Sequence, residues 1–210
     1  MIQNIPIDVY KRQDLVRNQW RRYTLPLCVG DKVDRDLSFD INDVNIEENS
    51  KRIPIPYVIP AGIQRENAIG PYPNLLQNEQ AISLSVKKLD GGCAVAVYKT
   101  IRMDMRQYER MRMYVHADSR EDFKKEDLVT FIRIGSDFTN NYYEYQIPTA
   151  ISKVDRVTPD KPSAEIWKVE NEMDISLLSL VELKKERNKV GAPFDLEYAI
   201  NDPEHPDRCV

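Results

Sequence analysis

The sequence predicts a mainly β protein, an antiparallel β-sandwich of jelly-roll kind with an extended proline-rich N-terminal arm and one short amphipathic helix. Several short segments alternate apolar and polar residues with a period of two, glycine and asparagine separate these segments, and only one segment has helical spacing. Short strands joined by turns favour a sandwich. A transmembrane barrel with a wet interior has the same alternation, but the proline-rich loops and the helix interrupt its regular succession of roughly ten-residue strands.

The length and composition limit the class of protein. The 210 residues allow one large domain or two small ones, and 41% apolar with 30% charged residues excludes a disordered chain. A net charge of −4 lacks the basic excess of a nucleic-acid surface, so no nucleic-acid partner is expected. The longest uncharged stretches, 53–64 and 67–78, are twelve residues each and contain prolines, whereas a membrane-spanning helix needs roughly 20 apolar residues.

The three cysteines, Cys28, Cys93 and Cys209, predict neither a disulfide framework nor a metal site. They are few, widely scattered and odd in number, and no two form a CxxC pair. On this pattern they say little about the cellular compartment.

Both ends of the chain differ from its middle. Residues 8–13 read like the translation of a sequencing adapter, so residues 1–13 are expected to be an artefact or a disordered leader. Residues 201–210 are polar and interrupted by prolines, which predicts a linker in a truncated chain.

Residues 14–79 are expected to form an extended arm with edge strands. Residues 20–29 are rich in aromatic and β-branched residues but contain Pro26, which suits an edge, and residues 37–46 alternate as a half-buried strand does. Residues 53–74 should be extended coil that crosses a surface, because prolines fix φ and remove backbone donors. The prolines of this coil are Pro54, Pro56, Pro60, Pro71 and Pro73.

Residues 80–200 are expected to form the sandwich lobe. The alternation of Ile82, Leu84 and Val86 is followed by Asp90-Gly91-Gly92, which predicts a tight hairpin into residues 93–98. Alternation also predicts strands over 110–116, 128–134 and 142–147, with a polar turn at 135–141 and Pro148 closing the last strand.

One helix is predicted near the C-terminal end of the lobe. Its spacing of three and four residues is set by Leu177, Leu180, Val181 and Lys184. Ser176 is a suitable N-cap, and Gly191 and Pro193 should end the helix.

Four residues are the candidate contacts for a ligand or a partner: Tyr142, Asp137, Asn140 and Asn141. Tyr142 belongs to the densest aromatic group of the chain and would stack on a sugar, or else lie outside a core formed by its neighbours Tyr143 and Tyr145. Asp137, Asn140 and Asn141 would ligate calcium or form Asx turns, and we favour the turns.

Other polar groups predict no chemistry. His116 and His205 are the only histidines, and His116 should be solvated on a polar strand face with Arg112. The acidic run at Asp34, Asp36, Asp40 and Asp43 lacks the glycine and the terminal glutamate of an EF-hand loop. Without a phosphate loop, a nucleophile elbow or an H-E-x-x-H motif, we expect no catalytic residue, no cofactor, no metal site and no enzymatic activity.

Specific strings then identify a resemblance. The chain contains Tyr-Val-Ile-Pro-Ala-Gly-Ile-Gln-Arg from residue 57, Met-Arg-Met-Tyr-Val-His-Ala from residue 111, and a run that ends in Asn-Tyr-Tyr-Glu-Tyr at residue 145. Their order and spacing, over residues 20–188, resemble the SprA family, called Sov in some relatives, of gliding-motility and secretion proteins of the Bacteroidetes. Ala61 departs from the family's pattern, which has a second proline before the glycine.

The resemblance implies a role in protein secretion. It implies a fragment of a very large outer-membrane β-barrel, the translocon of the type IX secretion system, through which folded cargo proteins reach the cell surface. The fragment would be a non-enzymatic structural lobe, periplasmic or extracellular. Its partners would be the remainder of its own barrel, other type IX secretion subunits and secreted cargo, with the outer membrane reached through the barrel. The competing hypothesis is a carbohydrate-binding β-sandwich module at the cell surface.

Overall fold

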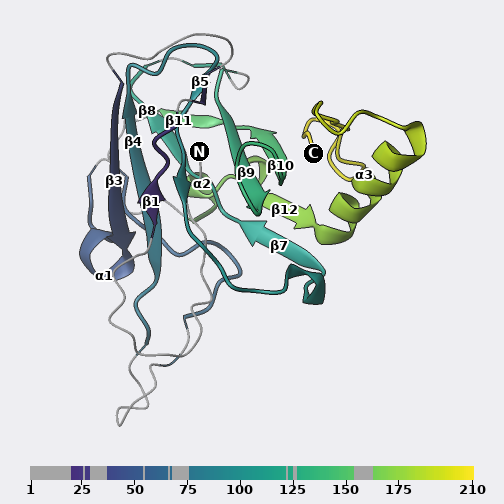
Figure 1. Cartoon of the computed structure of the whole chain (residues 1–210). Helices are drawn as coiled ribbons and strands as arrows, with labels where there is room; N and C mark the ends of the chain where they lie inside the picture. Colours follow the sequence, from purple (N-terminus) through teal and green to yellow (C-terminus); the bar gives the residue numbers. More distant parts are fainter. Residues whose placement is uncertain are drawn as a thin grey trace.

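The protein is mainly β, as predicted (Figure 1). The computed structural model describes residues 20–25, 27–28, 37–53, 55–65, 67, 76–121, 123–124, 127–153 and 163–210. Within these ranges the chain forms twelve strands and three α-helices. The strands pair two by two, and five of the six pairs are antiparallel. The predicted leader at residues 1–13 lies outside the described residues.

The longest pair joins the predicted arm to the predicted lobe. β3 (Ser38–Asn45) runs antiparallel to β4 (Gln80–Lys87) over eight residues, with Phe39 opposite Val86 and Ile41 opposite Leu84. Figure 1 shows these two strands side by side at the left of the molecule. The alternation of residues 37–46 therefore predicted a real strand, while the boundary between residues 79 and 80 stays a prediction.

The hairpin of β9 (Val129–Gly135) and β10 (Tyr142–Pro148) confirms the predicted strands on either side of the polar turn. Gly135 is required at the turn, because a Cβ atom there would lie 2.1 Å from the carbonyl oxygen of Asn141. Pro148 is the last residue of β10, as expected for a residue without a backbone donor.

The predicted hairpin around Asp90 is wrong in its pairing. The turn exists, since the Cys93 amide donates to the Asp90 carbonyl at 3.0 Å and Gly92 has φ of +83°. However, β5 (Cys93–Ala94) pairs with β2 (Leu27–Cys28), and β6 (Val97–Tyr98) pairs with β1 (Arg21–Arg22). A tight turn reverses the chain, but it does not choose the strand against which the outgoing segment pairs.

Two shorter pairs complete the described strands. β7 (Arg110–Met113) pairs with β12 (Met173–Ser176), which places Met113 opposite Met173 in the core. β8 (Ala117–Ser119) and β11 (Ile151–Lys153) are parallel, a departure from the predicted all-antiparallel pattern. The predicted strand over 110–116 is thus interrupted after Met113.

Helix α3 (Leu177–Val190) confirms the predicted helix and follows β12 directly, at the right of Figure 1. Leu177, Leu180 and Leu183 face the core, and Gly191 ends the helix in the left-handed region with φ of +66°. Ser176 occupies the N-cap position but makes no capping bond with its side chain. Val181, one of the residues that set the predicted helical spacing, is 49% exposed.

Four short helical segments also form within the described ranges: α1 (Ile46–Asn49), α2 (Ser163–Ile166) and the 3-10 turns η1 (Met105–Gln107) and η2 (Val169–Asn171). Each is shorter than two helical turns, so none shows the periodicity on which sequence analysis depends. In α1 the side chain of Asn45 accepts a bond from the Glu48 amide at 2.8 Å and caps the helix.

The last ten residues pack on the lobe, which corrects the predicted linker. Cys209 forms a backbone bridge with Gln146 of β10, and Val210 exchanges backbone hydrogen bonds with Ile200. The Val210 side chain is 7% exposed and belongs to the main core. Proline and polar residues suggested a linker, but these residues find backbone partners at Gln146 of β10, at Ile200 and among themselves.

Two apolar clusters form inside the described part of the chain. The smaller consists of Tyr57, Ala81, Ile166 and Trp167. The main core is lined by residues from both the predicted arm and the predicted lobe: Phe39, Ile82, Leu84, Val95, Val97, Met113, Val115, Ile132, Tyr145, Ile147, Met173, Ile175, Leu177, Leu180, Leu183 and Val210. The strand pairs are consistent with a sandwich, and the jelly-roll topology remains a prediction.

None of the described helices combines the length and the apolar character that crossing a bilayer requires.

Candidate functional site

The polar turn between β9 and β10 brings three of the four candidate residues together. One carboxylate oxygen of Asp137 accepts hydrogen bonds from the amides of Thr139, Asn140 and Asn141, at 3.0, 2.6 and 3.0 Å. Its other oxygen accepts a bond from the side-chain nitrogen of Asn141 at 2.6 Å. Because these donors, the Asn140 amide foremost, stabilise the ionised form, the pKa of Asp137 lies well below its usual range.

This geometry is that of an Asx turn, the interpretation that the sequence favoured over calcium ligation. The Asp137 carboxylate is directed at the backbone of its own loop rather than outward. Across the described ranges, no group of three or more His, Cys, Asp and Glu residues is arranged to hold a metal ion. Asp34 and Asp36 lie outside those ranges, and Asp40 and Asp43 are exposed on β3.

Tyr142 lies at the start of β10, where its ring and its hydroxyl both contact other side chains. The guanidinium carbon of Arg133 lies 4.3 Å from the ring centroid, a cation–π contact, and the hydroxyl donates to Glu197 at 2.8 Å. Desolvation, followed by the bond to Glu197, raises the pKa of Tyr142 to about 12. One face of the ring is therefore covered by Arg133, and a sugar would have to stack on the other face or displace the guanidinium.

Arg133 connects this tyrosine to the neighbouring turn. It bonds the carboxylate of Glu144 across the strand pair, and it donates to the carbonyl of Phe138 at 2.7 Å. Phe138 in turn packs against Tyr23 and Tyr98, with ring centroids 5.9 and 5.7 Å away. Arg133 thus holds the backbone of the turn at Phe138, and Tyr23 and Tyr98 hold its side chain, so the turn is a rigid part of the surface.

Tyr145 points inward, as the alternative to a sugar-binding cluster predicted. It is 2% exposed, and its hydroxyl donates to the buried carboxylate of Asp202. Burial, followed by this hydrogen bond, raises the pKa of Tyr145 well above its usual range. Tyr143 is half-buried against the main core. The aromatic run therefore serves the interior more than the surface.

His116 is not the solvated side chain that its alternation predicted. Its side chain is 15% exposed, its Nδ1 atom lies 2.7 Å from the Ile166 carbonyl, and its ring packs edge-on against Trp167 at 6.1 Å. The strand ends at Met113, and Ile166 at the end of α2 and the following Trp167 contact the His116 ring. No pattern in the sequence around His116 predicted these contacts, because Ile166 and Trp167 lie about fifty residues further along the chain.

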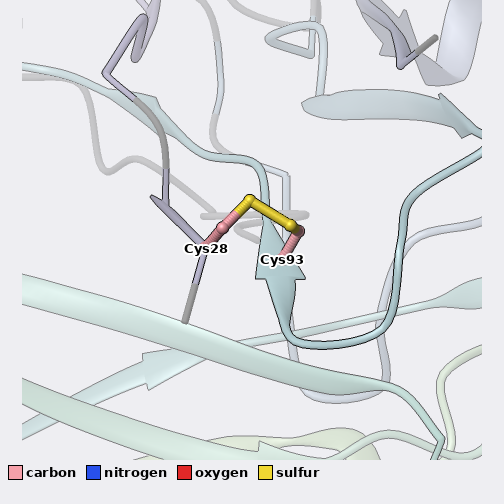
Figure 2. Close-up of a disulfide and its surroundings, with 2 residues drawn as sticks. All are labelled: Cys28 and Cys93. Carbon is pink, nitrogen blue, oxygen red and sulfur yellow. A yellow bond between two sulfur atoms is a disulfide. The ribbon is translucent and has the colours of Figure 1, made fainter. Parts of the chain in front are cut away.

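A disulfide links Cys28 to Cys93, a pair that the few, scattered and odd-numbered cysteines did not predict. The two residues are opposite each other in the β2–β5 pair, and Figure 2 shows the bond between the two strands. Cys209 is a free thiol, and burial raises its pKa. The cysteine spacing did not predict this pair, because spacing along the sequence does not show which strands lie side by side.

The polar atoms of the candidate residues bond to one another within the turn and, from Tyr142, to Glu197.

Comparison with known proteins supplies the family. A search of curated proteins finds no match for the chain. A family model described as a motility-related and secretion protein, SprA_N, matches residues 9–210. This match covers nearly the whole chain, including the turn, the disulfide and the packed C-terminal residues. The chain therefore belongs to the SprA_N family of motility-related and secretion proteins.

Proposed function

We propose that this chain is a non-enzymatic structural lobe of a large outer-membrane translocon, that of the type IX secretion system which supports gliding motility in the Bacteroidetes. The observation that carries the proposal is the family match over residues 9–210. The lobe contributes shape and contacts to the remainder of the same protein, to other secretion subunits and to the passage of secreted cargo. It carries out no reaction of its own.

The disulfide supports a location outside the cytoplasm. Disulfides form and persist in oxidising compartments, which include the bacterial periplasm and the cell surface. The Cys28–Cys93 bond joins a strand of the arm to a strand of the lobe. This suits a protein of the cell envelope on either side of the outer membrane.

The proline-rich arm supports a mechanical role. The described part of the arm is held on the lobe by the β3–β4 ladder and by the contacts of Tyr57 in the smaller apolar cluster. Proline restricts the backbone further. We propose that the arm and the lobe pack as one rigid body on the rest of the translocon and limit where a wide pore opens.

A replacement in the intact translocon tests this role. Residues 53–74 are replaced by a glycine–serine segment of equal length, and cargo secretion and uptake of a normally excluded dye are measured in cells. We expect secretion to fall or dye uptake to rise while the protein level is unchanged. Unchanged secretion and unchanged dye exclusion would refute the role of the arm.

Tyr142→Ala is the matched control, and it also tests the carbohydrate-binding alternative. We expect the variant to secrete normally, because the contacts of the Tyr142 side chain with Arg133 and Glu197 lie within this lobe. Isothermal titration of the chain with surface glycans should give no saturable heat. Saturable sugar binding that Tyr142→Ala abolishes would instead favour the module, an alternative that the covered ring face does not support.

A further inference from the structure

Residues 55–61, named the strap here, are held by three side chains that come from elsewhere in the chain. The indole nitrogen of Trp167 donates to the Val58 carbonyl at 2.8 Å. The hydroxyl of Ser163 donates to the Ile59 carbonyl at 2.8 Å. The hydroxyl of Tyr114 donates to the Ala61 carbonyl at 3.3 Å. Ser163 and Trp167 lie more than a hundred residues from the strap in sequence, at separations of 104 and 109.

The apolar contacts of the strap follow the same pattern. Tyr57 is 8% exposed and packs edge-on against the indole of Trp167 at 6.2 Å, and Pro60, three residues later, is also buried. A spacing of three residues is the repeat of a polyproline II helix, the conformation that Pro56 and Pro60 favour around them. Pro56 is buried as well, so the strap presents three buried apolar side chains to its surroundings, together with the carbonyls of Val58, Ile59 and Ala61.

The three donors form a prepared surface, named the cradle here, made of Tyr114, Ser163 and Trp167. The Trp167 amide donates to the Ser163 carbonyl at 2.8 Å. The ring of Tyr114 packs edge-on against the indole at 6.4 Å, and the ring of His116 supports it at 6.1 Å. The indole is thus oriented by neighbours outside the strap, so its N–H direction does not depend on the strap alone.

This combination matches a general mode of peptide recognition. A proline has no N–H, so a proline-rich segment cannot pair fully in a β-ladder, and receptors for such segments use aromatic walls and donors to the peptide carbonyls. The cradle supplies two aromatic rings that also carry donors, and a hydroxyl between them. We infer that Tyr114, Ser163 and Trp167 form a binding site for extended peptides of the pattern Pro-aromatic-x-x-Pro, and that the strap is its internal ligand.

The proposed peptide site consists only of the contacts between the strap and the cradle. The strap is connected to the cradle by side-chain bonds and ring packing, so a peptide of the same class supplied in trans can compete for the same carbonyl-binding positions. The site could fail to bind peptides while the chain still served as a translocon lobe. It could equally bind peptides in a chain that had no role in a translocon.

A peptide in trans tests the site. A fluorescein-labelled peptide with the sequence of residues 55–63 is titrated, by fluorescence polarisation, into the full chain and into a variant whose residues 55–63 are replaced by glycine and serine. We expect saturable binding to the replaced variant and at least tenfold weaker binding to the native chain, whose strap occupies the cradle. Peptides with the two prolines changed to alanine, or with scrambled order, are the matched controls and should bind at least fivefold more weakly.

Substitutions in the cradle locate the binding. Ser163→Ala and Tyr114→Phe each remove one donor and keep the surrounding packing, so in the replaced variant each should weaken the peptide about fivefold, the effect of one ordinary hydrogen bond. Tyr108→Phe, at an exposed tyrosine elsewhere, should leave the affinity unchanged. If the replaced variant does not fold alone, the native-sequence peptide should restore its circular dichroism and the scrambled peptide should not. Equal binding of the scrambled peptide, or neither binding nor rescue, would overturn the inference.

Discussion

Single side chains in this protein act mainly by bonding the backbone of distant or irregular segments. Asp137 organises its turn, the amide of Asn171 exchanges two 2.8 Å bonds with the backbone of Ala150, and Trp167 holds the strap. Short strands leave many backbone groups outside ladders, and buried groups of this kind need partners. The sequence could predict the first role, because an Asx turn is local, but it could not predict the other two, which join residues far apart in the chain.

Asp137→Ala should lower the melting temperature of the chain at pH 7, because the turn loses the acceptor of five hydrogen bonds. The pKa of Asp137 is lowered in the folded state, so its contribution is complete above the unfolded pKa of about 4 and is lost as the pH falls through the lower folded pKa. The difference in melting temperature between parent and variant should therefore shrink below about pH 4.

Asp137→Asn is the control for this measurement. The asparagine keeps an oxygen acceptor but carries no charge, so its melting temperature should lie between those of the parent and the alanine variant. A difference between parent and Asp137→Ala that stays constant from pH 7 to pH 2 would contradict the role of the ionised carboxylate.

At the scale of whole elements, patterns between neighbouring residues predicted single strands, turns and helices. The β9–β10 hairpin and α3 form where their alternation, turn residues and helical spacing placed them. The pairing of β5 with β2, and of β6 with β1, was not predictable, since it depends on which strand edge is adjacent after folding. The parallel β8–β11 pair and the disulfide depend on the same long-range arrangement.

The orientation of α3 is tested by two neighbouring residues. Leu180 is 8% exposed and packs in the main core, whereas Val181 is 49% exposed on the same helical turn. Leu180→Ala should reduce the free energy of unfolding by about 2–4 kcal/mol through lost burial and a new cavity. Val181→Ala should change it by no more than about 0.5 kcal/mol. Urea unfolding measures both, and equal losses would show that the helix faces the core differently.

The disulfide links the arm to the lobe and closes a loop with a sequence separation of 65 residues. The paired variant Cys28→Ser, Cys93→Ser should lose about 2–4 kcal/mol of stability, because the unfolded chain regains the freedom that the cross-link removed. Dithiothreitol should lower the melting temperature of the parent and of Cys209→Ser, and leave the paired variant unchanged. A parent that is insensitive to reduction, or that contains three free thiols by mass spectrometry, would contradict the bond.

At the scale of the whole molecule, arm, lobe and C-terminal residues share one core. Phe39 of the arm, Ile147 of the lobe and Val210 at the chain's last position all belong to the main cluster. The sequence divided these residues among an arm, a lobe and a linker, because composition changes along the chain while packing joins segments that are distant in sequence.

Truncation at the two ends tests this view, because the sequence predicted an artefact or leader at residues 1–13 and a linker at residues 201–210. Removal of residues 1–13, the expected adapter artefact or leader, should leave thermal unfolding unchanged. Removal of residues 201–210 should lower the melting temperature clearly. It takes Val210 out of the core, deprives the Tyr145 hydroxyl of the Asp202 carboxylate, and leaves the Gln146 backbone without its Cys209 partner.

The burial of Val210 alone is worth roughly 1.5–3 kcal/mol, so the loss should be well above experimental error. Circular dichroism of the two truncated chains and of the parent, melted under the same conditions, measures both effects. Val210→Ala in the full chain distinguishes the contribution of the Val210 side chain from that of the backbone bonds. This variant should show part of the loss in melting temperature, because the bridge between Cys209 and Gln146 is kept. If the chain that ends at residue 200 melts like the parent, the C-terminal residues are a linker after all, and the shared core ends at α3.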